Sequence, residues 1–338
     1  MKPLTARRIF WICAGLGSVL FVLVVVSLKL GATPISASDV VLTLVRRALG
    51  ETSLIPSDYN LIILELRLPR IALGILVGAS LSVSGASFQA LLRNPLADPY
   101  VLGVSSGAAL GSILSLVWAP HVPLAMQGAA FAGAALTITA VYFLGLRGGQ
   151  LDSTTLLLAG IISASFLSAV MMFLMTTLPG RDLRGMAFWL MGDLSTAAPI
   201  HLGFLFLLLV VAIGAIYTTA SDLNLILTGE QEARHLGVNV VRVKIVVYVA
   251  ASLLTGLAVS VSGAIGYVGL LVPHVMRMIF GNDYRLLIPT TALGGAIVLV
   301  AADTLARTVI APTELPVGAM TAVAGAPVFI YLLRRRLR

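Results

Sequence analysis

Residues 221–244 read SDLNLILTGEQEARHLGVNVVRVK and interrupt a chain that is otherwise mostly apolar. The charged and titratable side chains in this run are Asp222, Glu230, Glu232, Arg234, His235, Arg242 and Lys244. Each charge placed at the centre of a bilayer costs about 2.5–3.5 kcal/mol on insertion scales. The run is therefore expected to lie in water or against another protein, between two membrane-embedded halves.

The same run is expected to form two short helices on the membrane surface. Ser221 or Asp222 can cap the first helix, and Gly229 breaks the chain. Residues 230–236 can form the second helix, which Gly237 would end. We interpret the run as the contact for a separate, soluble subunit that drives the membrane part. An ordinary solvated loop is the alternative.

The composition places the chain in the membrane. Its 338 residues are 59% hydrophobic and only 11% charged, and the mean hydropathy is +1.03. Soluble domains carry roughly 25% charged residues. We therefore predict an all-α, polytopic membrane protein. The net charge of +8 is spread over loops, so no nucleic-acid partner is expected. Cys13 is the single cysteine and is expected to be a small buried hydrophobe.

Hydropathy predicts about ten membrane spans within a single transmembrane domain, residues 1–338. The expected spans are 9–29, 64–86, 100–118, 124–146, 153–177, 199–219, 243–261, 264–280, 286–309 and 317–333. Two shorter helices are expected near 40–49 and 184–192. Ten spans put both termini on one side. Most of the 22 lysines and arginines then fall on that side, which predicts that it is the cytoplasm and that 221–244 lies there.

The sequence also contains a short internal repeat. Ser-Val-Ser-Gly-Ala occurs at 82–86 and again at 260–264, and Gly78 and Gly256 precede the two copies at the same distance. The two copies lie on spans that run in opposite directions. Inverted repeats around a central pathway are common in transporters. We therefore expect spans 2–5 to mirror spans 7–10.

Motifs for catalysis are absent from the sequence. The three lysines are Lys2, Lys29 and Lys244, and none follows a glycine, so no P-loop for ATP is present. The four histidines are far apart, and no HExxH motif or acidic cluster occurs. A membrane-embedded enzyme is therefore disfavoured, and no metal site is expected.

Two polar pairs inside or beside spans are candidates for function. Asp303 and Arg307 lie four residues apart on one helix face, and charges inside a membrane are functional candidates by default. They suit an ion-coupled secondary transporter, a self-neutralising pair, or docking of a partner through Arg307. Ser153 and Thr154 open the fifth span and are either helix caps or gate residues.

Several ordered motifs resemble one family of permeases over nearly the whole chain. They include Arg67-Leu68-Pro69-Arg70, Asn94-Pro95-Leu96-Ala97-Asp98-Pro99, Gly229-Glu230, Ala233-Arg234, Leu236-Gly237, Pro273-His274, Ala302-Asp303 and Glu314-Leu315-Pro316. The family comprises the permease subunits of iron–siderophore, haem and cobalamin ABC importers.

The resemblance implies a ten-helix subunit of the cytoplasmic (inner) membrane that forms a homodimer around a central path. It implies two cytoplasmic ATPase subunits and an extracytoplasmic substrate-binding protein, with ATP on the partner and no cofactor in this chain. The expected cargo is an iron chelate (a siderophore complex or haem) or cobalamin, with an iron chelate as the first choice. The implied ATPase-coupling residues are Glu230, Ala233, Arg234, Leu236 and Gly237. The implied docking arginines for the binding protein are Arg67, Arg70 and Arg307, and the implied gate residues are Ser153 and Thr154.

Overall fold

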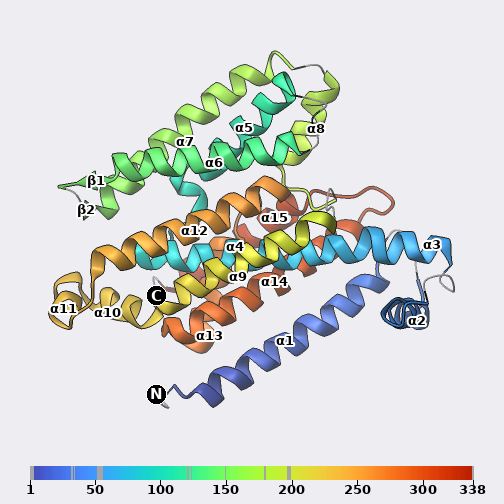
Figure 1. Cartoon of the computed structure of the whole chain (residues 1–338), viewed down its shortest axis with the longest axis horizontal. Helices are drawn as coiled ribbons and strands as arrows, with labels where there is room; N and C mark the ends of the chain where they lie inside the picture. Colours follow the sequence, from blue (N-terminus) through green and yellow to red (C-terminus); the bar gives the residue numbers. More distant parts are fainter. Residues whose placement is uncertain are drawn as a thin grey trace.

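The chain folds into a bundle of long helices (Figure 1). The computed structural model describes residues 4–31, 33, 35–51, 56–119, 122, 124–148, 150–178, 180–195 and 199–336. The elements are α1 (Ala6–Lys29), α2 (Ala37–Ala48), α3 (Ser57–Tyr59), the π-helix η2 (Asn60–Arg67), α4 (Leu68–Leu91), the 3₁₀ helix η3 (Pro99–Leu102), α5 (Val104–Trp118), α6 (Ala125–Leu144), β1 (Leu146–Arg147), β2 (Gln150–Leu151), α7 (Ser153–Met175), α8 (Gly180–Leu190), α9 (Pro199–Thr218), α10 (Ala220–Thr228), α11 (Glu230–His235), α12 (Val240–Ser262), α13 (Val268–Phe280), α14 (Tyr284–Thr308) and α15 (Val317–Arg336).

The prediction of an all-α polytopic membrane protein is confirmed. Within the described ranges, six helices are long and apolar enough to cross a bilayer: α1, η2 with α4, α6, α7, α12 and α14. The pair α9–α10, bent by 48°, makes a seventh candidate. The helices α5, α13 and α15 are apolar but shorter. Each of the ten expected spans thus has a helix, while the number that cross a membrane stays a prediction.

Three details of the expected elements are wrong. The second span was expected at 64–86, but helical structure starts at Ser57, because η2 adds π-helical turns before α4. The eighth span was expected from residue 264, but α13 begins at Val268, because Gly263 and Tyr267 take left-handed φ of 66° and 68°. Ser221 and Asp222 were expected to cap the first short helix, but α10 already begins at Ala220, so both residues lie inside it. The capping position is Thr219, whose side chain makes no capping hydrogen bond.

Helix α4 forms the centre of the bundle and packs against α14, α12, α13 and α9. Almost all of its side chains are buried. A helix enclosed this closely needs small residues at its contacts. A Cβ at Gly78 would overlap the carbonyl of Gly295 on α14, and one at Gly85 would overlap the carbonyl of Gly269 on α13. Pro273 removes the N–H that would otherwise bond the Gly269 carbonyl, which leaves that oxygen facing Gly85.

The helix pairing agrees with the inverted repeat. If α4 corresponds to α12 and α6 to α14, then the packing of α4 on α14 should be matched by α12 on α6, and both pairs are in contact. The two repeat helices also cross each other. The Ser84 hydroxyl on α4 donates to the Ala251 carbonyl at 2.8 Å and lies 2.6 Å from the Thr255 hydroxyl on α12.

The bundle has two distinct ends. The start of α1, the end of α15, the hairpin β1–β2 and the short helices α10 and α11 lie together at one end (Figure 1). The elements α2, α3 and α8 lie at the other end. This grouping agrees with both termini lying on the side of the charged run. Lys2 and Arg338, which the sequence assigns to the same side, lie outside the described residues.

Substitution of Gly85 by alanine should destabilise the bundle. The added methyl group would overlap the Gly269 backbone, and overpacking of this kind costs about 1–3 kcal/mol. Gly15→Ala on α1 is the matched control, because nothing lies within 4 Å of a Cβ there. Thermal unfolding of both variants in detergent measures the difference. Equal melting temperatures for Gly85→Ala and the wild type would show that the close contact is not needed.

Candidate functional site

The charged run forms the short helix that the sequence predicts. Helix α11 spans Glu230–His235, and Leu236 is its C-cap residue. Gly237 follows with a left-handed φ of 86°, a conformation that glycine adopts without a steric cost. The N–H of Val238 donates to the carbonyl of Ala233 at 3.0 Å, which closes the turn. The predicted helix and its glycine stop are confirmed.

Glu230 fastens this helix to the bundle. Its carboxylate lies 2.7 Å from the Lys244 ammonium on α12 and 3.6 Å from the guanidinium of Arg93, just after α4. Lys244 also donates to the carbonyl of Leu151 at 3.2 Å, and Arg93 donates to the carbonyl of Ile226 at 2.9 Å. One carboxylate therefore connects α11 with the ends of both repeat helices.

The other expected coupling residues occupy three different environments. Ala233 is fully buried on the side of α11 that faces the bundle. Arg234 donates to the side-chain oxygen of Gln150 in the β1–β2 hairpin at 2.9 Å. Leu236 is 66% exposed, although it is a large apolar side chain. The helix thus has a side held by the bundle and an exposed apolar end, which is an arrangement suited to contact with another protein.

A second link at this end was missed in the sequence. The Asn224 amide on α10 donates to the Asp283 carboxylate at 2.8 Å, and the N–H of Tyr284 donates to the Asn224 side-chain oxygen at 2.9 Å. Asp283 caps α14 and also pairs with Arg285 at 2.6 Å. Hydrogen bonds from Arg285 and then from Asn224 lower the pKa of Asp283 to about 2, against the effect of partial burial. The Gly-Asn-Asp sequence before α14 was a recognisable capping signal.

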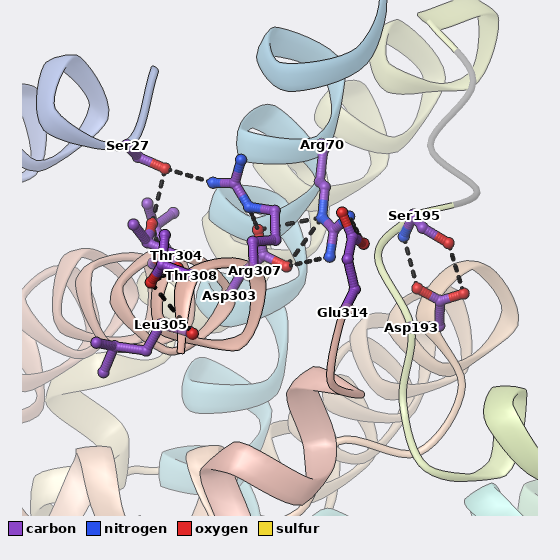
Figure 2. Close-up of polar contacts among 11 residues, drawn as sticks. Ser27, Arg70, Asp193, Ser195, Asp303, Thr304, Leu305, Arg307, Thr308 and Glu314 are labelled. Carbon is purple, nitrogen blue, oxygen red and sulfur yellow. Dashed lines mark hydrogen bonds and ion pairs between the residues drawn. The ribbon is translucent and has the colours of Figure 1, made fainter. Parts of the chain in front are cut away.

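A cluster of charges lies at the opposite end of the bundle (Figure 2). The Asp303 carboxylate lies 2.9 Å from Arg70 of α4 and 3.0 Å from Arg307 of its own helix. Arg70 also pairs with Glu314 at 2.6 Å. Arg307 donates to the Ser27 hydroxyl of α1 at 2.8 Å. The cluster thus connects α1, α4, α14 and the segment before α15.

The expected docking arginines are largely enclosed. The exposed fractions of Arg67, Arg70 and Arg307 are 6%, 8% and 5%. Arg67 donates to the carbonyls of Leu28 and Lys29 at 2.6 and 3.2 Å, so it holds the chain that leaves α1. The sequence suggested charges at separate span ends, but folding brings these ends together and buries the guanidinium groups. Their docking role stays a prediction.

All three arginines line one polar cavity. Its volume is about 300 Å³, and the polar part of its wall also includes Thr33, Glu65, Ser195 and Glu314. The Glu314 side chain is 45% exposed, so it is the more accessible partner of the ion pair with Arg70. The cavity thus brings the three guanidinium groups to one wall, where Glu314 already pairs with Arg70.

The expected gate residues lie where α7 begins. Asp152, rather than Ser153 or Thr154, caps this helix by accepting from the Thr155 N–H at 2.8 Å. Hydrogen bonds from Thr155 lower the pKa of Asp152. The Ser153 hydroxyl donates to the carbonyl of Leu91 at 3.2 Å and so connects α7 to the end of α4, while Thr154 is exposed. The gate role of Ser153 and Thr154 stays a prediction.

Comparison with known proteins identifies the family. The model of the FecCD transport family matches residues 19–335. The chain belongs to the FecCD transport family.

Named relatives of this FecCD-family protein are permeases of ABC importers. It is 40% identical to a hemin transport system permease of Yersinia pestis over 95% of both chains. It is 43% identical to a cobalamin import permease of Halobacterium salinarum over 83% of this chain and 76% of the relative. It is 39% identical to a ferric citrate import permease of Bacillus subtilis over 82% and 83%. This protein is thus a permease subunit of an ABC importer.

Solved structures agree with the fold of this FecCD-family permease. An inward-facing metal-chelate type ABC transporter superposes with a TM-score of 0.84 at 30% identity, covering 96% of this chain and 99% of the other. PsaBC from Streptococcus pneumoniae superposes with a TM-score of 0.55 at 16% identity, over 78% and 88%, and shows likeness of fold alone.

An ion-coupled transporter based on Asp303 and Arg307 is not retained for this FecCD-family permease. Asp303 lies between two guanidinium groups from different helices, which suits a structural connection. In the described part of the chain, no three His, Cys, Asp or Glu side chains gather closely enough to hold a metal ion.

Replacing Asp283 by asparagine should reduce thermal stability in a pH-dependent way. A carboxyl pKa lowered from 3.8 to about 2 in the fold contributes stability that is fully present above pH 4 and is lost as the pH falls through about 2. The difference in melting temperature between the wild type and Asp283→Asn should therefore be constant from pH 8 to pH 5 and should shrink below pH 4. Asp222→Asn on α10 is the matched control. A difference that grows towards acid pH would contradict the assignment.

Proposed function

We propose that this permease imports a metal chelate, with a ferric chelate or haem as the first candidate and cobalamin as the second. It acts as a homodimer in the cytoplasmic membrane, with both termini in the cytoplasm. Two separate ATPase subunits drive it from that side, and an extracytoplasmic protein delivers the substrate. The named relatives, which handle hemin, ferric citrate and cobalamin, support this class of cargo. No cofactor resident in this chain is needed.

The anchored helix α11 is the observation that carries the proposal. Glu230 connects it to α12 and to the end of α4, and the neighbouring α10 is bonded to the start of α14 through Asn224 and Asp283. A displacement of α11 by an ATPase subunit would therefore reach three central helices through direct contacts. A central path between two copies would then open to one side or the other, because ATP and the delivering protein favour different states.

Replacing Leu236 by aspartate should weaken the association with the ATPase. The side chain is exposed, so the permease should keep its stability, but a charge would enter an apolar contact. We expect the amount of copurified ATPase to fall at least tenfold, since loss of an apolar anchor costs about 2 kcal/mol or more. Leu49→Asp at the opposite end is the control, because Leu49 is 68% exposed.

Uptake into proteoliposomes completes this test. Transport of a ferric chelate, hemin or cobalamin should require ATP on the ATPase side and should persist after ionophores collapse all ion gradients. It should fall with Leu236→Asp and not with Leu49→Asp. Uptake that ignores ATP, or ATPase binding that Leu236→Asp leaves unchanged, would refute this coupling contact.

On the outer side, we propose that acidic side chains of the delivering protein enter the cavity of Arg67, Arg70 and Arg307. In the free permease, the Glu314 carboxylate forms an ion pair with the guanidinium group of Arg70. Two features support the proposal: Arg67 donates to backbone carbonyls, and the 45% exposed side chain of Glu314 is part of the cavity wall.

Replacing Glu314 by glutamine should strengthen docking. The change removes a competing carboxylate from Arg70, and partly exposed ion pairs are worth up to about 1 kcal/mol, so the affinity should rise about two- to fivefold. The gain should be larger at low salt. Glu51→Gln, outside the cavity, removes the same charge and should have little effect. Titration of the delivering protein against each permease variant gives the affinities, and a weaker complex for Glu314→Gln would contradict this role.

A further inference from the structure

A groove runs between α6 and α12, which lie side by side (Figure 1). It encloses about 310 Å³, and its lining is nearly all apolar. Aromatic rings of Phe131 and Tyr142 on α6 and of Tyr248 on α12 form much of its wall. Both helices are long and apolar enough to span a membrane. The groove is therefore at a depth where hydrocarbon chains are the solvent.

The groove reaches the end of the bundle that carries α11. Tyr142 and Ile245 line both the groove and a smaller polar cavity, whose wall also includes Arg234 and Lys244. The smaller cavity adjoins the Glu230–Lys244 ion pair. The apolar groove and the coupling helix are thus next to each other.

Two arginines flank this end of the groove. Arg242 precedes the lining residues Ile245 and Val249 by three and seven positions on α12, so all three lie on one helix face. Arg147 lies in β1, directly after α6, in the hairpin that packs against the start of α12. Both side chains are exposed, and neither forms an ion pair among residues whose placement is described.

We propose that the groove binds an acyl chain of an anionic phospholipid, with the phosphate group between Arg147 and Arg242. This inference rests on the proposed orientation, in which this end faces the cytoplasmic leaflet. Apolar grooves that end in basic side chains on the cytoplasmic side suit anionic lipids. The acyl chain packs in the groove while the basic side chains pair with the anionic headgroup. A lipid seated there lies beside the cavity of Arg234 and Lys244 and stabilises the hairpin and α11 in their observed positions.

Native mass spectrometry of the permease alone, in detergent, tests this site. The probes are phosphatidylglycerol and phosphatidylcholine with identical palmitoyl and oleoyl chains. The wild type should bind phosphatidylglycerol about tenfold more tightly or better, since each arginine near a membrane surface contributes a severalfold preference for anionic lipid. R147Q/R242Q should lose about tenfold of that preference.

Two further variants separate the site from a general charge effect. R7Q/R8Q on α1 removes the same charge at the same end and should keep the preference. Ala135→Phe places a ring in the groove from the α6 side and should weaken the binding of both lipids. Thermal unfolding without lipid shows that each variant is folded.

Four outcomes would overturn the proposal. The first is equal affinity of the wild type for the two lipids, the second is a loss in R7Q/R8Q as large as that in R147Q/R242Q, and the third is retention of both lipids by Ala135→Phe. If Ala135→Phe instead converts dimers to monomers, a second copy occupies the groove and the lipid proposal fails. No ATPase or delivering protein is present in these measurements, so their result is separate from that of the Leu236→Asp test.

Discussion

The close approach of backbones around α4 is the constraint on which the rest of the structure depends. Gly78 and Gly85 allow α14 and α13 to lie directly against this helix, and any side chain there would overlap backbone atoms. In a membrane, where hydrophobic burial gives little preference for helix association, such packing and hydrogen bonding hold helices together. The crossing of α4 with α12 at Ser84 and Ala251 adds a hydrogen bond to the same centre.

The same helix joins the two functional ends. Arg70, in its first turn, belongs to the charge cluster with Asp303. Arg93, just after its last residue, lies 3.6 Å from Glu230 of α11. A rigid central element thus contacts both the proposed docking cavity and the proposed ATPase contact. Under the proposed function, this arrangement gives a physical route between delivery of substrate and the use of ATP, because α4 has contacts at both ends.

Much of the fold was predictable because hydropathy and glycine positions are local signals. The helices of the ten expected spans, the stop of α11 at Gly237 and the inverted repeat all follow from them. The exact starts were not predictable where the backbone is unusual, as at η2 and at Tyr267, because π-helical turns and left-handed residues depend on tertiary contacts. The pairing of Asp303 with Arg307 was predictable, because the two residues lie four positions apart on one helix. Its pairing with Arg70 was not, because Arg70 lies 233 positions away in the chain.

The attachment of α1 has a consequence for how the chain is made. The most apolar part of this helix has no buried residue, and its principal packing partner is α14. The hydroxyls of Ser27 and Thr304, 2.7 Å apart in the fold, are separated by 277 positions in the chain. Because α1 is synthesised long before α14, it must remain surrounded by lipid until α14 has been made, and its apolar surface makes this delay tolerable.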